Sequence, residues 1–220
     1  MKTAPDTTTV GGIVLCGGHS SRMGLPKASL PIGQETMLER VVRLVAEVVE
    51  PVAVVAAPGQ SIPELPDHVL LARDRREDRG PLAGLEAGLA VLSGHVEAAY
   101  ATSCDVPLLV PGFLRSMIEL LADNDAVVPV DGDFYHPLAA VYRTSVLDEV
   151  TNLLARDQLR PRFLFDTVRT RRVEVAELRS ADPDLDTLTN LNRPEDYLTA
   201  LKKLGLKAPE EVVAQLRLAD

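Results

Sequence analysis

The stretch Ile13-Val-Leu-Cys-Gly-Gly-His-Ser-Ser-Arg-Met-Gly-Leu-Pro-Lys27 is the most informative part of the chain. Its apolar start predicts a short buried strand, and the two glycines that follow, Gly17 and Gly18, predict a tight loop after it. Glycines let backbone N–H groups approach an anion closely, and Arg22 and Lys27 can neutralise the charge of a polyphosphate. The stretch therefore predicts a phosphate-binding loop for a nucleotide.

This loop differs from the two most common phosphate-binding loops. A Walker loop has the pattern Gly-x-x-x-x-Gly-Lys-Ser/Thr, whereas Gly18 and Gly24 have a different spacing and Lys27 does not directly follow the second glycine. The dinucleotide-binding pattern Gly-x-Gly-x-x-Gly is also absent. An ordinary turn between a strand and a helix is the structural alternative. The presence of both Arg22 and Lys27 in one loop favours the phosphate-binding interpretation.

Length, composition and charge restrict the class of protein. The 220 residues fit one α/β domain, and the 46% apolar content without Trp suits a core of Val, Leu and Ala under a parallel sheet. The net charge of −9 argues against nucleic-acid binding, which needs an excess of cations. No apolar run approaches the ~18–20 residues that a membrane span needs. We therefore expect neither nucleic acid nor a membrane as a partner.

The ends of the chain and its cysteines suggest the domain organisation and the compartment. Residues 1–9 have no apolar core, so we expect a flexible N-terminal lead-in and not a secretory signal. Residues 10–205 are predicted to form a single domain, and residues 206–220 a C-terminal helical extension. The two cysteines, Cys16 and Cys104, form neither a Cys-x-x-Cys pair nor a zinc set. Reduced thiols in a cytoplasmic protein are the expectation.

Apolar runs and helical spacings alternate along the chain. This alternation predicts an α/β fold, a three-layer sandwich with a mostly parallel, Rossmann-like sheet and right-handed crossovers. After the first strand, the predicted strands span residues 52–57, 69–72, 98–103, 126–130, 138–142 and 172–177, and the predicted helices span 35–50, 81–92, 111–122, 145–156, 162–168, 194–204 and 209–218.

Asp105 directly follows the predicted strand 98–103. Ligands of such sheets bind at the carboxyl ends of the strands, so Asp105 faces the phosphate loop if the two strands are neighbours. A carboxylate beside a polyphosphate is suited to Mg²⁺, which prefers carboxylate and phosphate oxygens. A simple strand-terminating role is the structural alternative. The pairing with the loop favours Asp105 as a Mg²⁺ ligand.

Two further site candidates, Asn190 and Asn192, lie two residues apart. In an extended segment both side chains point to the same face. Asn192 is the second candidate metal ligand, and it could also be the N-cap of a helix that begins near Pro194. Gly80-Pro81 opens another predicted helix, whose free N–H groups favour an anion. The charged run 73–79 before it is typical of a solvated loop.

The chain shows no serine–histidine–acid set and no cysteine with a paired base, so a protein nucleophile is not indicated. Nucleotidyl transfer needs none, because an oxyanion of the acceptor can attack the α-phosphorus. The protein then supplies positioning, Mg²⁺ and cations against the developing negative charge. The residues above match this requirement.

The segment Leu15-Cys-Gly-Gly-His-Ser-Ser-Arg-Met-Gly-Leu-Pro-Lys27 closely resembles the signature Leu-x-Gly-Gly-x-x-x-Arg-Met-Gly-x-x-Lys of the MobA-like nucleotidyltransferases. The resemblance extends to about residue 201. Within the family, the chain is most similar to enzymes that transfer GMP from GTP to the molybdopterin cofactor. The further matching motifs, in the family's order, are Gly80-Pro-Leu-Ala-Gly84, Cys104-Asp-Val-Pro107, His136-Pro137 and Asn190-Leu-Asn192-Arg-Pro-Glu195.

The resemblance also implies roles for individual residues. Catalysis would depend on Arg22, Lys27 and Asp105, with Asp105 and Asn192 at the Mg²⁺ ion. The implied nucleotide contacts are Leu15, Cys16 and Gly17 through their backbones, together with Gly18, Lys27, Asp74, Gly80, Asp105, Asn190 and Asn192. One departure concerns the base. The family often has an Asn near the end of the second strand, where residues 52–57 are wholly apolar here.

The implied reaction converts GTP and molybdopterin cofactor into the guanine dinucleotide cofactor and pyrophosphate. Molybdoenzyme apoproteins or their chaperones are expected as further partners. Two enzymatic alternatives are a cytidylyltransferase that acts on the same pterin and a sugar-phosphate nucleotidyltransferase of the same fold. A non-catalytic carrier of the cofactor is the alternative from another class, and the combination of Arg22, Lys27 and Asp105 argues against it.

Overall fold

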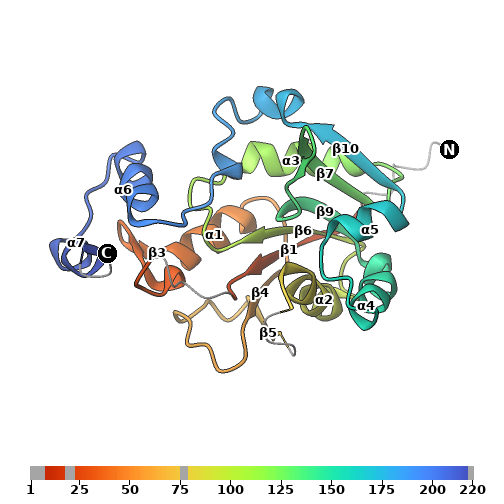
Figure 1. Ribbon diagram of the computed structural model, residues 1–220, viewed down its shortest axis with the longest axis horizontal. Coiled ribbons are helices and arrows are strands. Elements are labelled where there is room, and N and C mark those ends of the chain that lie inside the picture. The colour runs from red at the N-terminus through yellow and green to blue at the C-terminus, as the bar shows by residue number, and fades with distance from the viewer. Residues whose placement is uncertain (1–7, 18–22, 75–78, 218–220) are drawn as a thin grey trace.

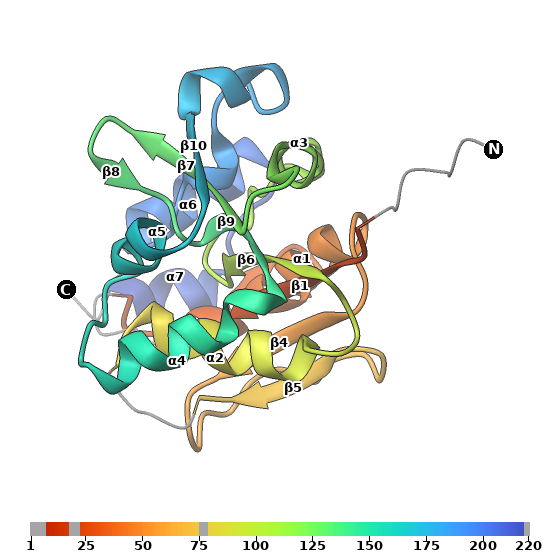
Figure 2. The same ribbon diagram turned by 90° about the vertical axis from the view of Figure 1, so that its right-hand side faces the viewer.

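In the computed structural model, one mixed sheet forms the centre of the molecule and helices cover both of its faces (Figures 1 and 2). The structure describes residues 8–17, 23–74 and 79–217. The strand order is β10-β7-β9-β6-β1-β4-β5, with β8 paired to β7. The strands are β1 (Val10–Leu15), β4 (Val52–Ala56), β5 (Leu70–Arg73), β6 (Ala98–Ser103), β7 (Ala126–Asp131), β8 (Phe134–Tyr135), β9 (Ala139–Arg143) and β10 (Thr170–Glu174).

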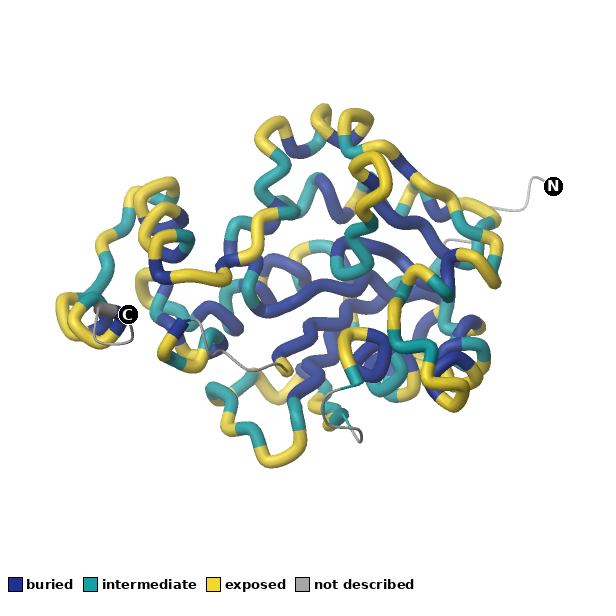
Figure 3. Tube along the Cα trace, in the orientation of Figure 1, coloured by how far each residue is buried: buried dark blue, intermediate teal, exposed yellow. Residues whose placement is uncertain are grey.

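The sheet is parallel through β6, β1, β4 and β5, and again between β7 and β10. Strand β9 runs antiparallel to both of its neighbours, β6 and β7, and so joins the two parallel parts. The predicted three-layer, mostly parallel α/β architecture is therefore confirmed. The central strands β1, β4, β6, β7 and β9 are buried on both faces, as the dark centre of Figure 3 shows, which explains their continuous apolar runs.

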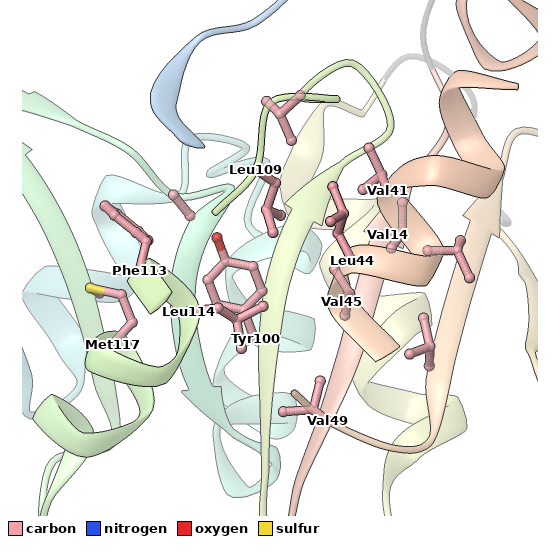
Figure 4. Packing of buried hydrophobic residues seen from close by; sticks show 14 of the residues in the cluster. Val14, Val41, Leu44, Val45, Val49, Tyr100, Leu109, Phe113, Leu114 and Met117 are labelled. Atoms are coloured by element: carbon pink, nitrogen blue, oxygen red, sulfur yellow. The ribbon is translucent and has the colours of Figure 1, made fainter. Parts of the chain in front are cut away.

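Helices α1 (Met37–Ala46) and α3 (Pro111–Leu121) cover one face of the sheet. Figure 4 shows their apolar side chains around the ring of Tyr100, which β6 contributes. The opposite face is covered by α2 (Pro81–Leu92), α4 (Leu147–Ala155) and α5 (Arg162–Thr167). None of the described helices combines the length and the apolar character that a membrane crossing requires.

A third cluster of apolar side chains lies beside the main sheet. It joins the small hairpin β2 (Pro31–Ile32) and β3 (Glu35–Thr36) to α6 (Pro194–Lys203) and α7 (Glu210–Arg217). Helix α7 belongs to the predicted C-terminal extension, and its Val212 and Leu216 are buried in this cluster together with Met23. The extension therefore packs against the segment that leads to Lys27.

Two predicted boundaries are wrong. The strand predicted over 172–177 begins earlier, at Thr170, and ends at Glu174, because Val175–Ser180 turns into a 3-10 helix. The helix predicted over 35–50 is shorter, because Glu35–Thr36 pairs as a strand and Thr36 caps α1. In this capping box the Thr36 hydroxyl accepts from the Glu39 N–H at 3.2 Å, and the Glu39 carboxylate accepts from the Thr36 N–H at 2.6 Å.

Helix α2 lies close to β1 because two of its residues on that side are glycines. A Cβ atom at Gly88 would lie 2.6 Å from Cγ2 of Ile13, a branched atom in the middle of the buried strand. At Gly84 a Cβ would lie 3.1 Å from the two methyl groups at the flexible end of Leu15. The helix can therefore accommodate a methyl group at residue 84 more easily than at residue 88.

We expect Gly88→Ala to lower the free energy of unfolding by about 1–3 kcal/mol, because overpacking against Ile13 outweighs the ~1 kcal/mol gain in helix propensity. Gly84→Ala is the matched control and should have a smaller effect. Urea unfolding followed by circular dichroism measures both. A Gly88→Ala variant as stable as the parent protein would contradict the close α2–β1 packing.

Candidate active site

A cleft of about 1140 Å³ lies at the carboxyl ends of β1, β4 and β6. This is the edge of the sheet at which α/β proteins bind their ligands. The residues that line it come from the ends of these strands, from the segment 24–28 and from the start of α2. Among them are the predicted nucleotide contacts Leu15, Cys16, Gly17, Lys27, Asp74, Gly80, Asp105 and Asn190.

The parallel pairing of β1 with β6 brings the two main motifs together. Leu15 is the register partner of Ser103, and the Cys104 N–H donates to the Leu15 carbonyl at 2.9 Å. Gly17 and Asp105 consequently leave the sheet side by side. This confirms the expectation that the two strands are neighbours, on which the placement of Asp105 beside the loop depended.

Lys27, Asp105, Asn190 and Asn192 form one hydrogen-bonded network. The Lys27 ammonium lies 2.9 Å from Oδ2 of Asp105 and donates to Oδ1 of Asn192 at 2.8 Å. The other oxygen of Asp105, Oδ1, accepts from the side-chain amide of Asn190 at 2.9 Å. The side chains of Lys27 and Asp105 are 17% and 14% exposed, so this ion pair is only partly screened by water. The network therefore places the Lys27 ammonium beside carboxylate and amide oxygen atoms of Asp105 and Asn192.

The alternative role of Asn192 as a helix cap is wrong. The N-cap of α6 is Arg193, and the carboxylate of Asp196 accepts from the N–H groups of Asn192 and Arg193 at 2.9 Å each. The side-chain oxygen of Asn192 accepts instead from the Lys27 ammonium.

The segment that carries the two asparagines is tied to the sheet by backbone hydrogen bonds. The Leu191 N–H donates to the Asp105 carbonyl at 2.8 Å. Eight residues before Asn190 in the sequence, the buried carboxylate of Asp182 accepts from the N–H of Asp186 at 3.0 Å and from the N–H of Thr187 at 2.9 Å. The Thr187 hydroxyl in turn accepts from the N–H of Val110 at 3.0 Å. Asp182 thus sets the path by which the chain reaches Asp105.

The other predicted residues lie on the opposite wall of the cleft or outside the described part of the chain. The Asp74 N–H donates to the Ala56 carbonyl at 2.9 Å, which places Asp74 at the end of β5. Gly80 has a φ of +71°, which favours glycine, and it precedes α2 as its N-cap. Gly18 and Arg22 lie outside the described residues.

Two polar residues of the site were not predicted. The Ser103 hydroxyl donates to Oδ1 of Asp105 and helps to fix that carboxylate. The Gln60 side chain donates to the Cys16 carbonyl at 3.0 Å and accepts from the Ala57 N–H at 2.9 Å, which joins the ends of β1 and β4. Ser103 could have been found as a polar residue at the end of an apolar strand. Gln60 lies in an irregular loop and gave no signal.

The two cysteines are buried, free and adjacent to each other. A hydrogen bond from the Cys104 thiol lowers the pKa of Cys16, and the Gln60 amide and the Arg73 charge act in the same direction. The same hydrogen bond, together with burial, raises the pKa of Cys104. His136, in the predicted His136-Pro137 motif, is half-buried, and burial lowers its pKa, so its imidazole is neutral at neutral pH.

The oxygen atoms around Lys27 are suited to Mg²⁺. The carboxylate of Asp105 and the amide oxygen of Asn192 already surround a positive charge, and both are oxygen ligands of the kind that Mg²⁺ takes. Among the described residues, no group of three or more His, Cys, Asp and Glu side chains could hold a metal ion. A Mg²⁺ ion with one or two protein ligands commonly completes its coordination with phosphate oxygens and water. The donor set therefore fits a metal that arrives with a nucleotide.

The match to a known family agrees with this geometry. Residues 12–173, which include most of β1, most of the residues that line the cleft, and Asp105, match the MobA-like NTP transferase domain. The chain belongs to this family. It is a nucleotidyltransferase, as the resemblance of the Leu15–Lys27 segment had implied.

Curated relatives in the family extend the match beyond the domain. A protein of Mycobacterium tuberculosis (strain H37Rv) named probable molybdenum cofactor guanylyltransferase is 38% identical over 194 residues, which cover 86% of this chain and 92% of the relative. A protein of the same name from Mycobacterium avium is 35% identical, and the aligned part covers 79% of this chain and 89% of the relative. The chain is thus a nucleotidyltransferase similar to molybdenum cofactor guanylyltransferases.

Solved structures show the same fold. Molybdopterin-guanine dinucleotide biosynthesis protein A from Archaeoglobus fulgidus superposes with a TM-score of 0.73 at 21% identity, over 89% of this chain and 98% of that one. A 2-C-methyl-D-erythritol 4-phosphate cytidylyltransferase from Thermus thermophilus gives 0.62 at 17% identity, over 90% and 98% of the two chains. At these identities the likeness establishes the nucleotidyltransferase fold.

The role of Asp182 can be tested by removing its carboxylate. Asp182→Ala leaves one buried and one partly buried N–H group without their acceptor and should lower the free energy of unfolding by about 1–3 kcal/mol. It should also lower nucleotidyl transfer, because Asn190 loses its position beside Asp105. Asp182→Asn, which retains one acceptor, should have a smaller effect, and Asp184→Ala, at an exposed position nearby, should have little. If Asp182→Ala were as stable and as active as Asp184→Ala, the positioning role of Asp182 would be contradicted.

Proposed function

We propose that this enzyme transfers GMP from GTP to the molybdopterin cofactor in a Mg²⁺-dependent reaction that releases pyrophosphate. The observation that carries the proposal is the network of Lys27, Asp105, Asn190 and Asn192 at the carboxyl ends of β1 and β6. The names of the mycobacterial relatives support guanine as the base and the molybdenum cofactor as the acceptor.

Backbone groups and the Lys27 cation contribute to the nucleotide half of the cleft. Gly17 leaves β1 exposed at the edge of the cleft, with no side chain to separate its backbone from a phosphate group. The Lys27 ammonium, now paired with Asp105, lies where it could turn to a phosphate oxygen. A lysine donates to phosphate as a compact charge, so it can follow the group as negative charge develops. Lys27 therefore neutralises the triphosphate.

The second half of the site, around Asp105 and Asn192, would stabilise the negative charge of the reacting phosphate groups. Asp105 and Asn192 would hold Mg²⁺, which supplies charge neutralisation at the phosphate oxygens. Asn190 and Ser103 both donate to Oδ1 of Asp105, which leaves Oδ2 directed to the cation. An oxygen of the acceptor's phosphate forms the new bond to the α-phosphorus, while the bond from this phosphorus to the pyrophosphate oxygen breaks. Such a reaction requires alignment and electrostatic stabilisation.

Asp105→Asn tests the metal role with a side chain of nearly the same shape. We expect Mg²⁺-dependent release of pyrophosphate to fall roughly 100-fold or more, because the charge opposite the cation is lost. Calorimetric titration with Mg²⁺ and GTP should show weaker binding by the variant. Asp123→Asn, at an exposed site beyond the end of α3, is the control. Near-normal turnover by Asp105→Asn would show that the metal role is wrong.

The base is tested by comparing GTP, CTP, ATP and UTP with the same pterin acceptor. We expect GTP to give a kcat/KM at least about tenfold higher than CTP, since tenfold corresponds to ~1.4 kcal/mol, about one hydrogen bond to the base. The readout is formation of the dinucleotide cofactor, followed by chromatography. A preference for CTP would identify the enzyme as the related cytidylyltransferase. Turnover with a sugar phosphate but not with the pterin would contradict the proposed acceptor.

A further inference from the structure

The two cysteines of the chain occupy opposite positions on neighbouring strands. Leu15 at the end of β1 and Ser103 at the end of β6 are register partners. Cys16 directly follows Leu15, and Cys104 directly follows Ser103. The hydrogen bond from the Cys104 N–H to the Leu15 carbonyl, at 2.9 Å, shows that the pairing continues beyond the strand ends. Neighbouring strands are about 4.8 Å apart, and the Cα atoms of a disulfide are about 4.4–6.8 Å apart. The backbone spacing therefore permits a disulfide.

The side chains also point to the same face of the sheet. Both cysteines belong to the apolar cluster under α1 and α3, in the row that contains Val14 on β1 and Tyr100 on β6. The two side chains thus lie side by side on one face of the sheet, and closing an S–S bond between them draws the two strand ends together.

A small reagent can reach this pair through the cleft. Cys16 and Cys104 are only 4% and 6% exposed, but both line the cleft between Gly17 and Asp105. The Nε2 atom of Gln60 lies 3.8 Å from the Cys16 sulfur, where its N–H can stabilise negative charge on that atom. The sequence contains no other cysteine, so no second thiol of the chain competes for either one.

We propose that Cys16 and Cys104 are an oxidation site, at which a peroxide closes an intramolecular disulfide that switches off nucleotide binding. The Cys16 sulfur attacks a peroxide oxygen, the O–O bond breaks, and the thiol proton leaves with the departing hydroxide as water. The Cys104 sulfur then attacks the resulting sulfenic acid and releases a second water. Two thiols are oxidised by two electrons to one disulfide, and one hydrogen peroxide is reduced to two waters.

The disulfide would change the site because each cysteine precedes a site residue. Drawing the two sulfurs to the ~2.05 Å of an S–S bond moves the strand ends from which Gly17 and Asp105 leave. The loss of activity on oxidation rests on the proposed function, whereas formation of the disulfide does not.

The test uses the full-length protein, treated with hydrogen peroxide and then with dithiothreitol. Alkylation of remaining thiols and peptide mass spectrometry should show a Cys16–Cys104 disulfide within one chain, with slower formation when GTP and Mg²⁺ fill the cleft. GTP affinity should fall at least about tenfold on oxidation and return on reduction. Cys104→Ala should form no disulfide. Its GTP affinity after peroxide, and again after dithiothreitol, should equal the affinity of the same variant before treatment.

Each readout can overturn the proposal separately. Two cysteines that remain open to alkylation after peroxide, or a disulfide that forms only between chains, would exclude the oxidation site. An intramolecular disulfide that leaves GTP affinity unchanged would exclude the switch. An enzyme that prefers another nucleotide would contradict the proposed function but not the oxidation site, because the disulfide is measured by mass and binding can be repeated with that nucleotide.

Discussion

The parallel pairing of β1 with β6 is the constraint on which the active site depends. It places the end of the glycine-containing motif beside the end of the aspartate motif, and both leave the sheet in the same direction. Because β1 also pairs with β4, its end is held from both sides. Gln60 reinforces one side by joining the β1 and β4 ends, and Leu191 reinforces the other by binding the Asp105 backbone. A rigid strand end can thus present backbone groups to a phosphate chain.

Charge in the site is balanced within the protein itself. The chain as a whole carries a net charge of −9, yet the Lys27 cation lies in the cleft, where the carboxylate of Asp105 and the amide oxygen of Asn192 contact it. Partly buried charges interact more strongly than exposed ones, so pairing Lys27 with Asp105 avoids leaving either charge alone in the cleft. An anionic ligand with its metal can replace this pair by two new ones, so that both Lys27 and Asp105 remain paired.

The sequence allowed the fold class, the succession of strands along the chain and the position of Asp105 at a strand end to be predicted, because these depend on local patterns. An apolar run followed by a carboxylate identifies a strand end without further context. The antiparallel direction of β9 was not predictable in this way, since an apolar run reads alike in either direction. The contacts of Gln60 with Cys16 and of Asn192 with Lys27 depend on the folded chain. Asp196, the N3 residue of the α6 capping box whose N-cap is Arg193, was an equally ordinary polar residue in the sequence.

The burial of Val212 and Leu216 with Met23 has a consequence for how the enzyme is made. Met23 stands at the entrance to the segment that carries Lys27, but part of the surface against which it packs is supplied by helix α7, which is synthesised long after it. The same holds for Asn190 and Asn192, which reach Asp105 from near the other end of the chain. A nascent chain that has completed its central sheet therefore still lacks a finished catalytic centre. During translation, folding of the sheet and maturation of the active site are separate events.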